Sequence, residues 1–164
     1  MPFTFFTDQE PVSVNRSNNK AQYKAKKDAW IAHLQSECDR KYPLAAPGIT
    51  HYSSSEHLYF LLAYYTLGQN LKDVDNLLKI ACDSFKGRLF PNDDKVHYFV
   101  SQAVELRPNC ITGFTIDGLP EDALNGLLDF IRGTSTSSST TRTYIECGRF
   151  QPNMIKYNLE EVWK

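Results

Sequence analysis

Long apolar runs are missing from this 164-residue sequence. No stretch approaches the roughly 18–20 consecutive apolar residues that a membrane-spanning helix needs. Residues 1–6, MPFTFF, also lack the basic start and long apolar centre of a secretory signal peptide. These absences predict a protein of the cytoplasm that does not associate with a membrane.

Binding motifs built on cysteine, histidine or glycine are missing too. The four histidines show neither metal-ligand spacing nor the spacing of a catalytic triad. No glycine-rich phosphate loop is present, so we predict no nucleotide cofactor. The cysteines are scattered without a Cys-x-x-Cys pair, which favours reduced, buried thiols over a zinc site; they are Cys38, Cys82, Cys110 and Cys147.

Acidic residues are absent from one segment, residues 11–27, although the whole chain has a net charge of only −1. The basic residues of this segment are Arg16, Lys20, Lys24, Lys26 and Lys27. Lys20, Lys24 and Lys27 follow i, i+4, i+7 spacing and so share one helix face. Such a row is usually a solvated face, and contact with phosphate groups is the alternative.

Hydrophobic periodicity predicts a small mixed β-sheet flanked by helices, of the α/β or α+β class, in one domain. We place the core at about residues 3–106 and a C-terminal extension at about 107–164. The predicted strands are residues 3–7, 57–67, 96–106 and 143–146. The predicted helices are residues 20–38, a stripe that ends at Phe85, and 119–133. Residues 134–141 are wholly Ser and Thr, which is typical of a linker or an exposed loop.

Four carboxylates crowd the middle of the chain, at Asp73, Asp75, Asp93 and Asp94. In an extended backbone Asp73 and Asp75 would point to the same face, because side chains alternate along a strand. A helix that starts at Asp75 would place Lys79 one turn along on the same side. So many like charges in one place predict a bound cation among them.

The residue types suit phosphodiester cleavage assisted by Mg²⁺, or alternatively Mn²⁺. Both ions prefer oxygen ligands, and the reaction needs an activated water and neutralisation of the phosphate charge. Asp73 and Asp75 would supply two ligands, and Asp94 or Asp93 a third. Lys79 would stabilise the charge that develops on the phosphate. The motif therefore predicts a metal-dependent nuclease.

A calcium site, a glycosidase pair and a simple helix cap each fit the acidic motif less well. A calcium-binding EF-hand fails because its fifth and sixth positions would be Leu77 and Leu78. A glycosidase carboxylate pair lacks an aromatic pocket in the local sequence. A helix cap followed by a solvated loop accounts for Asp75 and Asn76, but not for Asp73 or the Asp93-Asp94 pair.

This motif resembles the signature of the RusA family of Holliday junction resolvases. The matching residues are Asp73, Asp75, Asn76, Lys79, Asp83, Gly87, Asp93 and Asp94. The loop at residues 11–16 and the lysine-rich helix after it are also similar to the start of that family, and the resemblance covers residues 4–106. Two departures stand out. Lys72 keeps the positive charge that the family often has before the first Asp, but not the fork of an Arg. Residues 101–104 lack the lysine that members often carry on the strand after the Asp-Asp pair.

The resemblance implies a RusA-like fold and a homodimer that binds four-way DNA junctions. It implies Holliday junction resolution in DNA recombination and repair, by paired nicks made with Mg²⁺ or Mn²⁺. Asp73, Asp75 and Asp94 would be metal ligands and, with Lys79, the catalytic residues. The expected DNA contacts are Arg16, Lys20, Lys24, Lys27 and Lys72. Two alternatives stay open: a nuclease specific for other branched DNA such as flaps, and a non-catalytic nucleic-acid-binding protein of the same fold.

Overall fold

A mixed β-sheet with helices on both faces forms the body of the protein, an α+β architecture. The computed structural model describes residues 2–12, 20–43, 46, 48–67, 72–106, 121–132 and 140–151. These residues form β1 (Phe3–Thr7), α1 (Lys20–Lys41), β2 (Leu58–Thr66), α2 (Val74–Phe85), the 3₁₀ turn η1 (Asp93–Lys95), β3 (Val96–Glu105), α3 (Glu121–Arg132) and β4 (Thr141–Arg149). The predicted small mixed sheet flanked by helices is confirmed.

The strands lie in the order β1-β4-β2-β3. β2 and β3 are parallel, and α2 is the crossover that such a pair needs. β4 runs antiparallel to both β1 and β2 and separates them. The sheet therefore includes a strand from the predicted C-terminal extension, and the predicted boundary of the core at residue 106 is too short. Of the Ser/Thr segment, residues 134–139 lie outside the described residues, and Thr141 already belongs to β4.

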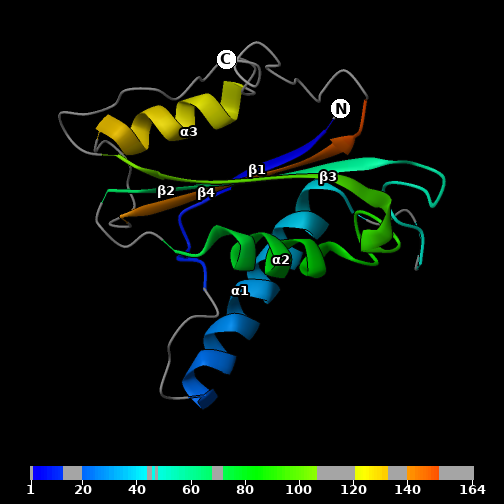
Figure 1. The fold of residues 1–164 in the computed structure, drawn as a ribbon, viewed down its shortest axis with the longest axis horizontal. Helices are drawn as coiled ribbons and strands as arrows, with labels where there is room; N and C mark the ends of the chain where they lie inside the picture. Colours follow the sequence, from blue (N-terminus) through cyan, green and yellow to red (C-terminus); the bar gives the residue numbers. More distant parts are fainter. Residues whose placement is uncertain are drawn as a thin grey trace, which may run out of the picture.

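Two hydrophobic layers cover the sheet, with α1 and α2 on one face and α3 on the other (Figure 1). Alternate residues of β2 divide between them. Phe60 and Leu62 pack in the cluster beneath α1 and α2, and Ala63 and Tyr65 pack beneath α3. Every residue of β2 except Leu61 is buried. The long apolar run thus forms a central strand that is covered on both faces, as predicted.

Only the second half of α1 packs against the body. Its buried residues, Trp30, Leu34 and Cys38, follow i, i+4, i+8 spacing, and residues 20–29 contain none that is buried. The first turns therefore extend away from the sheet (Figure 1). The helix continues to Lys41, three residues beyond the predicted end.

The thiols that the structure describes match the prediction. Cys38, Cys82 and Cys147 are buried and unpaired, and Cys110 lies outside the described residues. Burial raises the pKa of Cys38 and of Cys82 to about 12. Among the described helices, none is both long and apolar enough to cross a membrane.

Candidate functional site

Helix α2 begins one residue after the first carboxylate of the acidic motif. Asp73 is its N-cap, and the carboxylate accepts hydrogen bonds from the backbone N–H of Asn76 at 3.4 Å and from its side-chain amide at 2.6 Å. The prediction of an extended backbone from Asp73 to Asp75 is wrong, because Val74 already belongs to the helix. The two carboxylates therefore do not share one face of a strand.

Asp75 points instead towards the sheet. Its carboxylate accepts a hydrogen bond of 3.0 Å from the Ser101 hydroxyl on β3. Ser101 stands in the segment where the RusA resemblance leads one to expect a lysine. A neutral hydroxyl orients the carboxylate but leaves its negative charge in place, which suits a metal ligand.

A row of charged residues follows the exposed side of α2. Asp75, Lys79 and Asp83 are spaced at i, i+4, i+8 and line a pocket of about 220 Å³. Asp93 of η1 and the half-exposed Phe99 of β3 form part of the same lining. The fold thus brings Asp75 and Lys79 together with one acid of the Asp93-Asp94 pair.

Lys86 bridges two of the carboxylates that line this pocket, those of Asp83 and Asp93. Its ammonium group lies 2.8 Å from a carboxylate oxygen of Asp83 and 2.8 Å from one of Asp93. These hydrogen-bonded carboxylates raise the pKa of Lys86, and its ammonium group lowers the pKa of Asp93. The bridge fastens η1 to the end of α2, and so fixes the turn that carries Asp94.

Asp94 itself is exposed and more weakly paired. Its carboxylate lies 3.6 Å from the ammonium group of Lys95, a longer ion pair than those of Lys86. Asp94 does not line the pocket that contains Asp75 and Asp93. The Asp93 carboxylate is therefore held in its ion pair with Lys86, whereas the exposed Asp94 carboxylate can rotate towards a bound ion.

The predicted ligands Asp73, Asp75 and Asp94 do not form a ready-made metal cage. Within the described residues no three His, Cys, Asp or Glu side chains are close enough to hold one ion. Two ligands of a Mg²⁺ ion lie about 4 Å apart or less, because each is about 2.1 Å from the metal. All three carboxylates are exposed, and exposed side chains change rotamer within nanoseconds. The carboxylate oxygens therefore fit Mg²⁺ or Mn²⁺ in type. Metal binding would require the three side chains to rotate towards one another.

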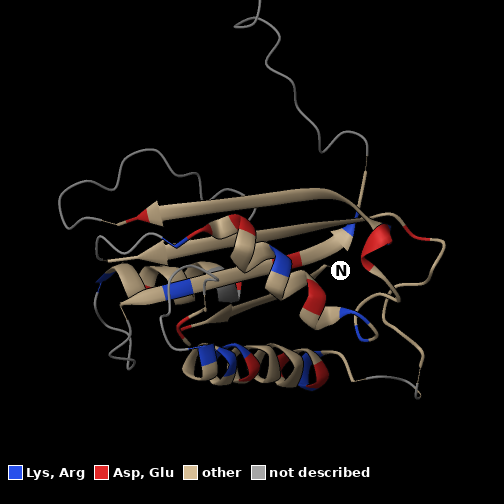
Figure 2. Ribbon diagram, turned by 60° about the horizontal axis from the view of Figure 1, so that its bottom comes forward, with Lys and Arg blue, Asp and Glu red and all other residues tan. Residues whose placement is uncertain are grey.

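The basic residues predicted to contact DNA have different environments. Lys20 and Lys24 are exposed and Lys27 is half-buried, all on the part of α1 that extends from the body. Figure 2 shows this basic end of α1, and the acidic residues on α2 and η1. Lys72 differs, because its ammonium group pairs with Glu10 at 2.8 Å and donates to the Pro11 carbonyl. Arg16 lies outside the described residues.

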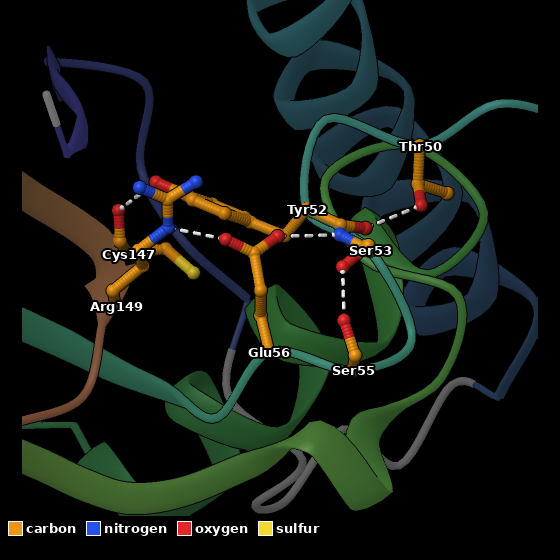
Figure 3. A network of polar contacts seen from close by, with 7 residues as sticks. All are labelled: Thr50, Tyr52, Ser53, Ser55, Glu56, Cys147 and Arg149. Carbon is orange, nitrogen blue, oxygen red and sulfur yellow. Dashed lines mark hydrogen bonds and ion pairs between the residues drawn. The ribbon is translucent and has the colours of Figure 1, made fainter.

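A second pocket, of about 530 Å³, was not predicted from the sequence. Tyr42, His51, Tyr52, Tyr59 and Arg149 contribute to its lining. An ion pair between Arg149 and Glu56 holds the loop before β2 against the end of β4 (Figure 3). The pocket combines segments that are far apart in the chain, so no local motif indicates it.

Comparison with known proteins assigns no family. No protein-family model matches this chain, and a search of curated protein sequences finds no relative.

Proposed function

We propose that the protein is a Mg²⁺- or Mn²⁺-dependent endonuclease that cuts branched DNA, with the four-way Holliday junction as its substrate. The observation that carries this proposal is the pocket where Asp75 and Lys79 of α2 face Asp93 of η1. Carboxylates and one lysine in a shared depression match the needs of phosphodiester cleavage.

Each residue would have its own role. Asp73, Asp75 and Asp94 would hold the ion, which when bound neutralises phosphate charge and activates water. Ser101 orients Asp75 by its hydrogen bond. Asp93 acts as a positioning residue, because its ion pair with Lys86 holds the turn on which Asp94 lies.

Lys79 supplies positive charge to the substrate phosphate. It is exposed and lies one helical turn from Asp75 in the pocket lining. A lysine is a point charge with three donors, so it can follow a phosphate group as charge builds up on its oxygens.

Binding to DNA would use the basic first turns of α1. Lys20 and Lys24 are exposed on a helix segment that extends beyond the body. Ammonium groups in such a place reach the phosphate backbone and make binding weaken as salt rises. A homodimer would present two such helices and two pockets about a two-fold axis, which matches the symmetry of a four-way junction.

The direct test is a cleavage assay with end-labelled four-way junctions, flaps and linear duplex, each with Mg²⁺, Mn²⁺ or EDTA. We expect paired, symmetric nicks in the junction with either metal and none with EDTA. Cutting of flaps in preference to junctions would support the proposed cleavage chemistry but assign a different DNA substrate to the enzyme. No metal-dependent cutting of any of the three DNAs would refute the enzyme.

Asp75→Asn separates catalysis from binding. We expect the cleavage rate to fall about 10²-fold or more, the scale for removing one charge-stabilising group from an active site, while junction binding persists. Asp129→Asn is the matched control, since it makes the same charge change on α3, across the sheet from the pocket. Equal activity of both variants and the wild type would exclude Asp75 from the site.

Asp93 and Asp94 can be distinguished by the same substitution to Asn. If Asp94 is the ligand, Asp94→Asn loses cleavage at every metal concentration. Asp93→Asn should instead be partly active, with more Mg²⁺ needed for half-maximal rate, because only the Lys86 bridge is lost. The reverse pattern would assign the ligand to Asp93.

A non-catalytic DNA-binding protein is the second candidate. It is favoured by one observation, that the described carboxylates are not gathered into a group that could hold an ion. Junction binding without cleavage, unaffected by Asp75→Asn and weakened by replacing Lys20 and Lys24 with Ala, would support it.

A further inference from the structure

Two exposed histidines meet at the start of the parallel strand pair. His57 comes directly before β2, and His97 is the second residue of β3. Their ring atoms Nδ1 of His57 and Nε2 of His97 are 2.9 Å apart, and the ring centroids are 4.3 Å apart at an interplanar angle of 74°. The proposed nuclease function uses neither residue.

The backbone at His57 is held on both sides. Its carbonyl accepts a hydrogen bond of 2.8 Å from the N–H of Phe150, just after β4. The preceding residue, Glu56, accepts a hydrogen bond of 2.6 Å from the Ser53 N–H and pairs with Arg149 (Figure 3). His97 is placed by the pairing of β3 with β2, which shifts register between Leu58 and Tyr59. The fold therefore fixes the positions from which both rings extend.

We infer that His57 and His97 form a two-imidazole site for a first-row transition-metal ion, Cu²⁺ or Ni²⁺. Imidazole nitrogen suits these ions, whereas Mg²⁺ prefers oxygen. A metal bonded at about 2.05 Å to two nitrogens 2.9 Å apart would subtend an angle of about 90°. This is the angle between neighbouring ligands in the square-planar or octahedral sites of Cu²⁺ and Ni²⁺.

Zn²⁺ fits less well by the same geometry. Tetrahedral coordination at that bond length would require nitrogens about 3.3 Å apart, wider than the pair in this structure. The intrinsic order of affinity also places Cu²⁺ above Zn²⁺. Geometry places Cu²⁺ and Ni²⁺ above Zn²⁺, and the affinity order places Cu²⁺ first, so together they predict the order Cu²⁺, Ni²⁺, Zn²⁺ for this pair.

Metal binding would replace the hydrogen bond between the rings. In the metal-free protein one ring N–H donates to the other ring nitrogen. For both nitrogens to bind a metal, the donating ring must carry its proton on the other nitrogen, so no net proton is released from two neutral rings. Acid would weaken binding, because protons compete for the same lone pairs.

The rest of the coordination shell would be water. No third His, Cys, Asp or Glu is placed to join the two histidines within the described residues. The site would therefore hold its ion reversibly and would link the starts of β2 and β3, the parallel pair at one edge of the sheet.

The test is a titration of the full chain with CuCl₂ and, separately, NiCl₂, by calorimetry and by electron paramagnetic resonance for Cu²⁺. We expect two coordinated nitrogens in the wild type. His57→Ala and His97→Ala should each weaken binding about tenfold or more, by analogy with the loss from disturbing metal ligands. The double variant should bind more weakly than either single variant, because it lacks the one imidazole that each of them keeps.

His51→Ala is the matched control, because His51 is exposed and lies in the separate aromatic pocket. It should bind Cu²⁺ as the wild type does. A large excess of MgCl₂ should not compete. Unchanged Cu²⁺ affinity in folded His57→Ala and His97→Ala, or an equal loss in His51→Ala, would overturn the inference.

Discussion

Gly148 is the position where a single methyl group should be most costly. A Cβ at this residue of β4 would lie 2.7 Å from Cε1, 2.8 Å from the hydroxyl oxygen and 2.9 Å from Cζ of Tyr59. Atoms of this kind normally approach to about 3.5–4.0 Å. The Tyr59 ring would therefore have to withdraw by roughly 1 Å in the Gly148→Ala variant.

The ring has little room to do so. Tyr59 is only 9% exposed, and its hydroxyl donates a hydrogen bond to the Glu146 carboxylate. Staying in place costs about 1–3 kcal/mol as overpacking, and moving away loses a hydrogen bond to a charged group worth about 1.5–3 kcal/mol. Removing a glycine from a strand returns about 0.5–1 kcal/mol. The net destabilisation of Gly148→Ala is then about 1–2 kcal/mol.

Urea unfolding followed by circular dichroism measures this change. Gly126→Ala is the matched control, because the nearest atom to its Cβ is Cγ of Phe6 at 4.0 Å. It lies inside α3 and should stabilise by about 0.5–1 kcal/mol. In a Tyr59→Ala background the penalty at Gly148 should disappear, as expected for residues in direct contact. A neutral or stabilising Gly148→Ala with Tyr59 present would refute the reasoning.

Two further predictions concern the helix cap and pH. Asp73→Ala should lower the free energy of unfolding by about 0.5–2 kcal/mol through loss of the α2 cap. Asp73→Asn should keep the stability, because Asn also caps helices, but should lose DNA cleavage. An equal loss of stability in both variants would contradict the capping role. Burial lowers the pKa of His33, whose Nε2 is 2.7 Å from the Thr7 hydroxyl. Folding therefore favours the neutral form of His33. The stability that neutral His33 contributes is present above about pH 6.5, the ordinary histidine pKa, and is lost as the pH falls through the lower pKa of the folded state. Urea midpoints at about pH 7.5 and 5.5 should show a smaller acid-induced loss in His33→Gln than in the wild type, and identical losses would exclude His33.

Elements with local signals are predictable from the sequence. The i, i+4, i+8 row of Trp30, Leu34 and Cys38 indicates α1, and the long apolar run indicates a central strand. The strand predicted at residues 143–146 is too short, and β4 belongs to the core rather than to an extension. Its ends contain Thr141, Arg142 and Gly148, which have no strong strand pattern. Their burial comes from partners far away in the chain, which periodicity does not report.

The candidate site is predictable in residue type and less so in geometry. Asp75 and Lys79 are expected on one side of a helix start, and both line one pocket. Asp73 is extended, but the prediction that the extended backbone continues to Asp75 is wrong, because Asp73 caps the helix and Val74 already belongs to it. The pair His57 and His97 depends on the register of β2 against β3, so no spacing in the sequence indicates it.

The central place of β4 has a consequence for how the protein is made. Among the described strands β1 pairs only with β4, so that Phe3 lies opposite Cys147, far away in the sequence. Contacts of such long sequence separation form slowly. During synthesis β1 must wait until β4 has left the ribosome, with Phe3 and Phe5 exposed in the meantime. β4 therefore joins the sheet last, between β1 and β2. A chain cut before Thr141 would lack the strand that connects β1 to the rest of the sheet.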